Sequence, residues 1–220
     1  MNNKLSKRLL AIAEMIEDGK TVYDIGCDHA YLDIYLTLHR KNITCYAIDV
    51  RPSVIKIAKE NIKNAGLIIP IILNNGLENI NINDNSTVVL AGMGTRTILK
   101  IIKNKNIPEM IIQSNDDLFL LRNELMNAGY KITEEKLIFE FGYYYVFIKV
   151  ILEKNVKYCY EELLLGPVLL QKRDHIFKEY LRSQLKKYNK MLSNIPVDII
   201  KKREVIEKNI NVILKEIERN

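Results

Sequence analysis

The fold of this chain is decided by one stretch, Val22-Tyr23-Asp24-Ile25-Gly26-Cys27-Asp28-His29-Ala30-Tyr31-Leu32. A run of β-branched and aromatic residues ends in Asp-x-Gly, and a helical pattern follows. This is typical of the first strand–turn–helix of a nucleotide-binding α/β domain. A dinucleotide fingerprint has three glycines here, because the backbone must approach a pyrophosphate closely. The present turn has one glycine with acids on both sides. It therefore favours a cationic ligand without phosphate, such as S-adenosylmethionine, over NAD.

Strands and helices alternate along the first two thirds of the chain. The pattern predicts strands over 21–26, 43–49, 68–73, 87–92 and 109–114, and helices over 4–17, 30–40, 53–65, 95–104 and 116–129. Such alternation predicts an α/β fold with a parallel, doubly wound sheet. Two β-rich runs within 131–152 meet at Gly142 and predict an antiparallel hairpin at one edge of the sheet. A Rossmann-like sheet that ends in such a hairpin is a class I methyltransferase fold.

The pattern beyond residue 157 is helical. Leu163-Leu164-Leu165-Gly166-Pro167 marks a stop and a restart, and Ser193-Asn194-Ile195-Pro196 separates two longer helical stretches. Apolar residues recur in both stretches at steps of three and four, so the two should fold back as an antiparallel, coiled-coil-like hairpin. We expect a monomer in which this stripe is the packing seam, with a dimer through the same stripe as the alternative.

The net charge of +6 lies in the C-terminal third of the chain. Residues 1–153 contain 18 Lys and Arg against 18 Asp and Glu, whereas residues 154–220 contain 15 against 9. We therefore expect a catalytic domain over 1–153 and a basic helical domain over 154–220 that binds a polyanion, most simply nucleic acid. A solvated helical face would give the same charge. The candidate phosphate contacts are Lys186, Lys187, Lys201, Lys202 and Arg203.

The composition excludes several classes of protein. The hydrophobic content of 48% and the charged content of 27% are typical of a soluble globular protein. The sequence has no apolar run near the ~20 residues that cross a bilayer, and no secretory signal, so we expect a cytoplasmic protein. The three cysteines lie far apart, and the histidines and carboxylates lack metal-ligand spacing. We therefore expect neither disulfides nor a metal site.

The ends of four successive strands supply the candidate cofactor-binding residues, because ligands of open α/β sheets lie at the carboxyl ends of the strands. Asp24 would take the ammonium of a methionine moiety, and Gly26 would let the ligand approach. Asp49 would accept two ribose hydroxyls. The other candidates are Asn75 and Gly76 for the adenine edge, and Ala91, Gly92 and Met93 beside cofactor and substrate. Each has a simpler structural explanation, such as a helix cap or a common turn. Their combination indicates a nucleotide-type cofactor.

Six blocks of residues occur here in the order found in a bacterial family. They are Leu5-Ser6-Lys7-Arg8-Leu9, Asp24-Ile25-Gly26-x-Asp28-His29-Ala30-Tyr31-Leu32, Gly76-Leu77-Glu78, Ala91-Gly92-Met93-Gly94, Gln113-x-Asn115 and Leu165-Gly166-Pro167. Together they resemble the TrmK family of tRNA (adenine-N1)-methyltransferases, which modify the D-arm adenine at tRNA position 22. The resemblance covers nearly the whole chain. It implies a Rossmann-like methyltransferase domain followed by a coiled-coil domain, with S-adenosylmethionine as methyl donor and tRNA as acceptor.

The chain departs from the family pattern at four positions. Asp33 and Ser114 stand where the family usually has Pro, Thr95 where it usually has Gly, and Asn75 where it commonly has Asp. None of these departures removes a chemically essential group. Asp33 adds an acid near the site that the sequence does not explain.

Adenine N1 has an in-plane lone pair and no proton, so catalysis would be mainly alignment of the reacting atoms. A carboxylate near the exocyclic amine would stabilise the growing positive charge. Asp28 is the candidate, with His29 and Asn115 as helpers. Arg8 would hold a tRNA phosphate or position Asp28, and Tyr31 would stack on the flipped base or pack in the core.

Three alternative functions stay open from the sequence. The chain could methylate another RNA position or a small molecule, or it could be a non-catalytic RNA-binding protein with a decayed methyltransferase fold. The basic tail argues against the small molecule, and the intact set of strand-end residues argues against decay.

Overall fold

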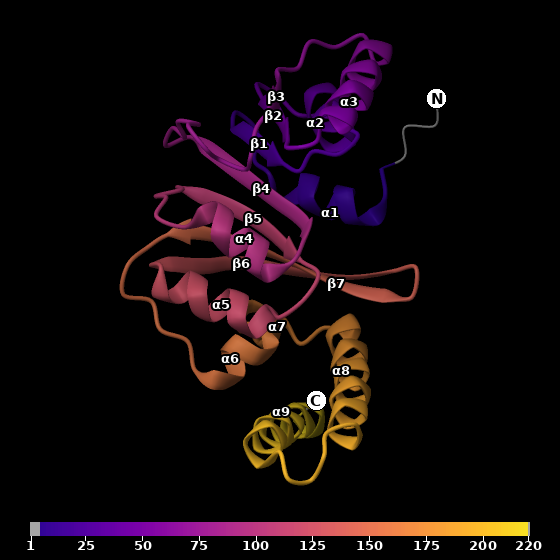
Figure 1. Ribbon diagram of the computed structural model, residues 1–220, viewed down its shortest axis with the longest axis vertical. Coiled ribbons are helices and arrows are strands. Elements are labelled where there is room, and N and C mark those ends of the chain that lie inside the picture. The colour runs from indigo at the N-terminus through magenta and orange to yellow at the C-terminus, as the bar shows by residue number, and fades with distance from the viewer. Residues whose placement is uncertain (1–4, 220) are drawn as a thin grey trace. The chain divides into compact units, whose positions relative to one another are not determined.

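The computed structural model describes residues 5–219, and the chain forms two compact units that divide between Lys157 and Tyr158 (Figure 1). The helix predicted over 4–17 starts at a residue outside the described range. Its described part is α1 (Lys7–Met15), which begins after Ser6, whose side chain accepts a hydrogen bond from the Leu9 N–H at 3.3 Å.

The predicted strands and helices of the first unit are confirmed, with ends that differ by a few residues. The strands are β1 (Thr21–Ile25), β2 (Thr44–Asp49), β3 (Ile71–Leu73), β4 (Ser86–Met93), β5 (Glu109–Ser114), β6 (Tyr130–Glu140) and β7 (Tyr143–Leu152). The helices after α1 are α2 (Tyr31–His39), α3 (Pro52–Asn64), α4 (Thr95–Ile102) and α5 (Leu118–Asn127). β3 is shorter than the predicted 68–73. Pro70 cannot donate to a ladder, and Ile68 is 98% exposed.

Within the described residues these strands form one seven-stranded sheet in the order β3-β2-β1-β4-β5-β7-β6. All neighbouring pairs from β3 to β5 are parallel, and β7 is antiparallel to both β5 and β6. From β1 to β3 successive strands are added toward one edge of the sheet, and from β4 to β5 they are added toward the other edge. Because crossovers between parallel strands are right-handed, the helices of these two halves cover opposite faces of the sheet. The predicted class I methyltransferase fold, with its antiparallel hairpin edge, is confirmed.

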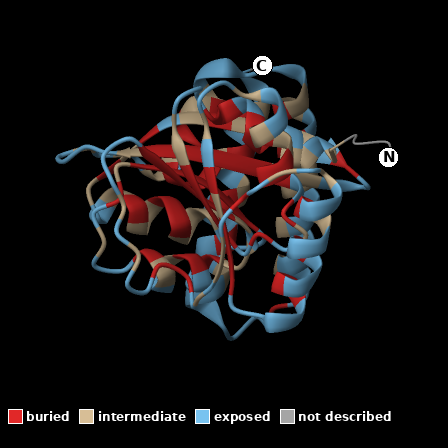
Figure 2. Ribbon diagram, turned by 90° about the horizontal axis from the view of Figure 1, so that it is seen from above, coloured by how far each residue is buried: buried red, intermediate tan, exposed pale blue. Residues whose placement is uncertain are grey.

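The central strands are buried on both faces, as parallel sheets require (Figure 2). Val22, Val89 and Ile111 are fully buried, at 0% exposure. They belong to one core with apolar residues of α1, α2 and α3. One ion pair of the first unit is also fully buried. The Arg122 guanidinium of α5 contacts Glu135 of β6 at 2.9 Å, with both side chains fully buried.

The reversal of strand order between β1 and β4 determines where a ligand can bind. The chain runs from β1 to β2 on one side and returns to β4 on the other, which leaves a crevice at the carboxyl ends of these strands. Because β6 is antiparallel to β7 and β7 to β5, β6 runs parallel to β5. The turn between β6 and β7 therefore lies at the same edge of the sheet.

The second unit contains α6 (Tyr160–Leu165), α7 (Pro167–Lys172), α8 (His175–Ser193) and α9 (Ile200–Glu218). The predicted breaks at Gly166-Pro167 and at 193–196 are confirmed. Helices α8 and α9 contact each other, whereas their coiled-coil-like pairing stays a prediction. In the part of the chain that the structure describes, helices long and apolar enough to span a membrane do not occur.

One predicted phosphate contact in this unit has a different role. The Arg203 guanidinium donates hydrogen bonds to the carbonyl oxygens of Leu192 at 3.2 Å and Ile195 at 2.8 Å. It thereby satisfies carbonyls at the end of α8. Lys186, Lys187, Lys201 and Lys202, here called the tail lysines, are exposed on α8 and α9.

Candidate functional site

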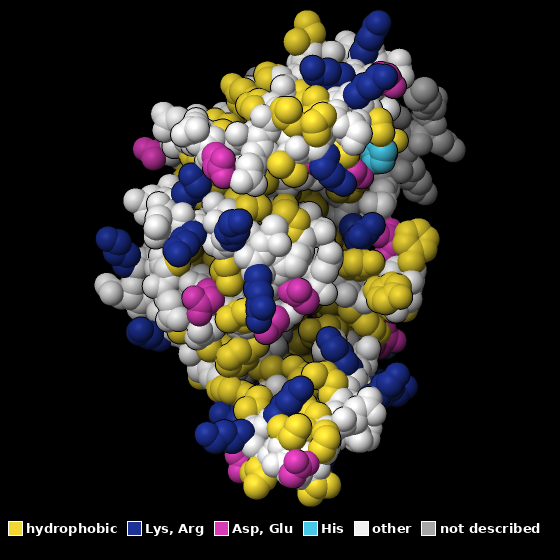
Figure 3. All heavy atoms as spheres, in the orientation of Figure 1, with side chains coloured by type: hydrophobic (Ala, Val, Ile, Leu, Met, Phe, Trp, Pro, Cys, Tyr) yellow, Lys and Arg dark blue, Asp and Glu magenta, His cyan; other side chains and the backbone are white. Residues whose placement is uncertain are grey.

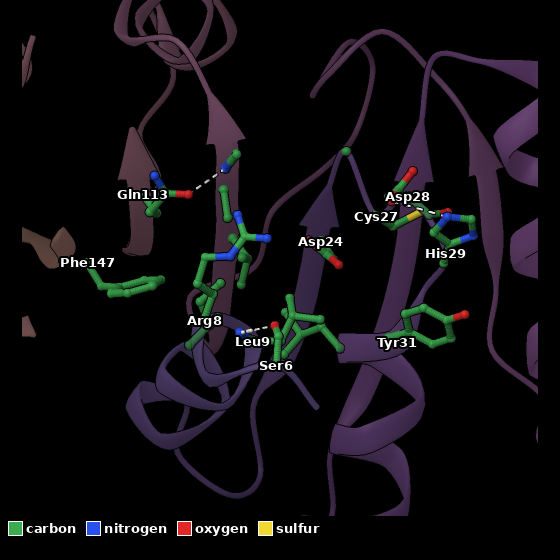
Figure 4. A pocket seen from close by; sticks show the side chains of 16 residues that line it. Ser6, Arg8, Leu9, Asp24, Cys27, Asp28, His29, Tyr31, Gln113 and Phe147 are labelled. Carbon is green, nitrogen blue, oxygen red and sulfur yellow. Dashed lines mark hydrogen bonds and ion pairs between the residues drawn. The ribbon is translucent and has the colours of Figure 1, made fainter. Parts of the chain in front are cut away.

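Two adjoining hollows lie at the carboxyl edge of the sheet. The inner cavity, of about 220 Å³, is lined by Ser6, Arg8, Leu9, Ile12, Asp24, Gly26, Cys27, Asp28, His29, Tyr31, Leu32, Val89, Ala91, Gly92, Gln113 and Phe147 (Figure 4). The outer cleft, of about 790 Å³, is lined by Ile25, Gly26, Asp28, Ile48, Asp49, Val50, Arg51, Asn74, Asn75, Gly76, Ala91, Gly92, Met93, Arg96, Thr97, Lys100 and Ile101. The structure thus brings together every residue predicted to bind cofactor, and also Arg8, Asp28 and His29.

The turn after β1 separates the two hollows and is conformationally strained. Gly26, Asp28 and Ala30 all have positive φ, at 78°, 49° and 56°. Such values suit glycine but are uncommon for other residues, and they gather at functional sites. The N–H groups of Gly26 and Cys27 both donate to the Ile48 carbonyl, at 2.7 and 3.0 Å. This anchor holds the Asp28 side chain at the border that both hollows share.

Asp24 and Asp33 form a buried pair of acids beside the inner cavity. Their exposed fractions are 6% and 0%, and neither oxygen of the Asp33 side chain receives a hydrogen bond from a described donor. Burial raises the pKa of Asp24 to about 7, with Asp49 and Asp28 adding to the rise and a hydrogen bond from Asp33 opposing it. Burial also raises the pKa of Asp33 well above its usual value. Asp33 therefore holds a proton that it donates to Asp24, which explains how this extra acid is tolerated.

Asp49 is paired with a residue that the sequence prediction missed. Its carboxylate accepts hydrogen bonds from the Arg51 backbone N–H at 2.9 Å and from the Arg51 guanidinium at 3.0 Å on each oxygen. Burial would raise the pKa of Asp49, but these contacts outweigh it and hold the pKa below its usual value. The same guanidinium lies 3.6 Å from Asp28. The spacing Asp-x-Arg after β2 is the sequence signal that could have identified Arg51.

Asp28 lies between two cationic or ionisable groups. Its side chain is 58% exposed, 3.6 Å from Arg51 and 3.6 Å from the His29 ring. The His29 ring stacks on Tyr31 with 5.5 Å between centroids. Tyr31 is 52% exposed, so the alternative that this ring packs in the core is wrong.

Arg8 does not position Asp28, contrary to one of its two predicted roles. Its side chain forms an ion pair with Glu140 at 3.3 Å, and its guanidinium lies 4.8 Å from the centre of the Tyr145 ring. Figure 4 shows Arg8 extending from α1 into the inner cavity, apart from Asp28. The positioning of Asp28 belongs to Arg51 and His29.

The Gln113-x-Asn115 block supports a bulge in β4. The register slips between Ala91 and Met93, so Gly92 stands out of the ladder with a φ of 75°. Its N–H donates to the Gln113 side chain at 3.0 Å, and its carbonyl accepts from the Asn115 amide at 2.8 Å. Gln113 also lines the inner cavity. The sequence identifies Gln113 as part of a motif but does not predict it as a site residue. Asn115 contacts Gly92 through this hydrogen bond but lines neither hollow.

Two departures from the family pattern contact each other. The hydroxyls of Thr95 and Ser114 lie 2.8 Å apart, with both residues buried. Thr95 opens α4, where its N–H donates to Asp116 at 2.7 Å. The two hydroxyls therefore replace a Gly and a Pro as a complementary pair, away from the lining of the site.

The donor set of the two hollows determines what they can hold. Asp24, Asp28 and Asp49 line the two hollows with carboxylates, which could accept hydrogen bonds from a ligand with an ammonium group and vicinal hydroxyls, and Gly26 and Gly92 have no side chains to fill the space beside it. The same acids would repel a pyrophosphate. Among residues 5–219 the structure shows no group of three or more His, Cys, Asp or Glu arranged to hold a metal ion.

Comparison with known proteins gives consistent results. The methyltransferase domain family matches residues 5–148. The tRNA (adenine(22)-N(1))-methyltransferase of Bacillus subtilis is 30% identical over 186 residues, which are 79% of this chain and 78% of that protein. The structure of Mycoplasma capricolum TrmK in complex with S-adenosyl-homocysteine is similar with a TM-score of 0.84 and 32% identity, over 97% of this chain and 98% of that one. A protein of the NADB-Rossmann superfamily from Streptococcus agalactiae gives a TM-score of 0.88 with 28% identity, over 97% of both chains.

Proposed function

This chain belongs to the TrmK family of methyltransferases, and on that premise we propose that it methylates N1 of an unpaired tRNA adenine. The donor is S-adenosylmethionine, and the target is the D-arm adenine at position 22, which the name of the B. subtilis relative specifies. The observation that carries the proposal is the strained single-glycine turn, which holds Asp28 between two adjoining hollows lined by further carboxylates.

The residues fit the cofactor along the edge of the sheet. Asp24 receives the ammonium group in the inner cavity, and Asp49 accepts the ribose hydroxyls in competition with Arg51. The adenine lies against Asn75, Gly76 and the 91–93 segment of the outer cleft. When bound, S-adenosylmethionine supplies an electrophilic methyl group on a sulfonium.

Asp28 orients the acceptor base in this proposal. Adenine N1 attacks through its in-plane lone pair and gains positive charge, so a carboxylate at the exocyclic amine stabilises the transition state more than the ground state. Arg51 and His29 flank the carboxylate at 3.6 Å each and fix its direction. Since no proton must leave N1 before attack, alignment and this electrostatic contact carry the catalysis.

Other residues handle the RNA around the target base. N1 lies on the pairing edge of adenine, so the base must leave its stack before reaction. The exposed Tyr31 ring offers a stacking surface, with His29 behind it. Arg8 is 42% exposed at the inner cavity and can contact a phosphate. Asn115 assists by holding Gly92 in place.

The helical tail, residues 154–220, supplies tRNA affinity through the tail lysines, which are exposed. We propose a cytoplasmic location, in accordance with the proposed tRNA substrate. We also propose a monomer, with a dimer through the apolar helical stripe as the alternative. A methyltransferase for another RNA position is the alternative that shares all of these site features.

Methyl transfer to bulk tRNA tests the proposal. Purified protein is incubated with tritiated S-adenosylmethionine and unmodified bulk tRNA, and the tRNA is digested to nucleosides. The expected product is 1-methyladenosine. Label in another nucleoside would favour the alternative RNA target, and no label in any nucleoside would contradict the proposal.

A further inference from the structure

The tip of the β6–β7 hairpin exposes three aromatic side chains. Phe139, Phe141 and Tyr143 are 45%, 84% and 68% exposed. In Figure 1 the hairpin extends past the neighbouring strand ends, and in Figure 3 hydrophobic side chains project at the same place. The Phe139 ring also contacts the Tyr144 ring, with 4.8 Å between centroids. The exposed surface of Phe141 and Tyr143 contributes little to the stability of the fold, because water still covers it.

The backbone of the tip is unfavourable for the residue that it carries. Glu140 pairs with Tyr143, so the turn has two residues, and these have φ values of 49° at Phe141 and 84° at Gly142. Two positive φ values define a type I′ turn, whose first position prefers Asn, Asp or Gly. A bulky residue in this conformation is an outlier that points to a function.

The tip is connected to the candidate site. It lies at the carboxyl edge of the sheet, and Glu140 accepts a hydrogen bond from the Lys7 N–H at 2.8 Å and pairs with Arg8 at 3.3 Å. Arg8 lines the inner cavity. Lys7, which precedes Arg8 in the chain, is exposed. Aromatic surface next to two cationic residues complements the bases and phosphates of single-stranded RNA.

We propose that the aromatic tip, Phe139, Phe141 and Tyr143, stacks on unpaired tRNA bases next to the target adenine. Extrusion of the adenine leaves its neighbours without a stacking partner, and aromatic side chains at the mouth of the cavity replace that partner. This inference rests on the proposed tRNA substrate. It assigns the tip a role in holding the opened RNA, whereas the tail lysines contribute affinity through phosphates.

Phe141→Asn separates this role from a structural one. Asn is favoured in the turn, so the variant should melt at the same or a higher temperature. It should bind S-adenosylhomocysteine as the wild type does, since the tip lines neither hollow. Its affinity for unmodified tRNA should fall by about tenfold, in line with the loss of one stacked base. Phe141→Tyr is the matched control and should keep wild-type affinity.

A single fluorophore gives a direct readout, because the chain contains no tryptophan. Phe141→Trp places the only indole at the tip, and stacking on a base should quench its fluorescence when unmodified tRNA is added. A fully paired RNA duplex, which offers no unstacked base, should leave the signal unchanged.

The outcomes separate the inference from the proposed function. If wild-type protein methylates tRNA while Phe141→Asn retains full tRNA affinity and the Phe141→Trp signal does not change, only the inference is wrong. If wild-type protein neither binds nor methylates tRNA, both are wrong. A wild-type dimer that Phe141→Asn converts to monomer in sedimentation, with tRNA affinity kept, would assign the tip to self-association and overturn the inference.

Discussion

Cofactor affinity should depend on pH through the buried acid pair. At pH 7 the Asp24 carboxyl is about half ionised, because burial raises its pKa to about 7. An ammonium group binds the ionised carboxylate well and the protonated acid poorly. As the pH falls, cofactor binding must therefore displace the proton of Asp24 from a growing fraction of the molecules. From a pKa of about 7, the ionised fraction of Asp24 falls ~15-fold between pH 7.0 and pH 5.5. The affinity for S-adenosylhomocysteine should fall by the same factor.

Isothermal titration calorimetry measures both parts of this prediction. The dissociation constant is followed between pH 7.0 and 5.5, and titrations in buffers of different ionisation enthalpy count the protons released on binding. Proton release should approach one per cofactor at the lower pH. Asp24→Asn should bind weakly, with a flat profile.

Asp33 provides the matched test of the hydrogen bond within the pair. The neutral Asp33 carboxyl donates to Asp24 and lowers the pKa of Asp24. Asp33→Asn keeps an amide donor and should preserve the profile, whereas Asp33→Ala loses the donor and should move the midpoint to higher pH. A wild-type affinity that is constant over this range, or a slope that persists in Asp24→Asn, would refute the reasoning.

Three further results are expected. The raised pKa of Asp33 means that the native state keeps a proton that the unfolded chain loses, so the stability of the protein falls as the pH rises above the pKa of Asp33 in the unfolded chain. Asp33→Asn should therefore raise the melting temperature more at pH 8 than at pH 5. Equal shifts at the two pH values would contradict this. Asp28→Asn should slow single-turnover methylation by ~10²–10³ at unchanged cofactor affinity, whereas Asp49→Ala should mainly weaken cofactor binding; near-normal transfer by Asp28→Asn would leave alignment alone as the source of catalysis. Gln in place of the four tail lysines should weaken tRNA binding and reduce the slope of log affinity against log salt by about 3–4, and an unchanged slope would remove these lysines from the interface.

The sheet and the strand-end residues were predictable because each depends on local signals. The Asp-x-Gly turn at 24–26 marks the end of β1 by composition alone, and the alternation of patterns gives the topology. Strand ends then meet at one edge by geometry. For this reason the position of a residue at a strand end is enough to predict that it lines one of the adjoining hollows, even though its contacts are not known from the sequence.

Side-chain pairing was not predictable, because it depends on distances between segments that the pattern does not contain. Arg8 pairs with Glu140, 132 positions away in the chain, rather than with Asp28. Arg203 donates to two carbonyl oxygens whose position depends on where α8 ends, which the helical pattern does not define exactly. The sequence offers no explanation for the extra acid at Asp33, whereas its burial against Asp24 raises its pKa and accounts for it as a neutral acid.

Methylation of one defined tRNA tests the central claim most directly. A tRNA transcript with adenine at position 22 and a transcript with guanine there are each incubated with S-adenosylmethionine, and the modified nucleoside is located by mass spectrometry. We expect one 1-methyladenosine at position 22 of the first transcript and no methylation of the second, because guanine N1 carries a proton and has no free lone pair. Equal methylation of both transcripts, or a methyl group elsewhere in the first, would contradict the account.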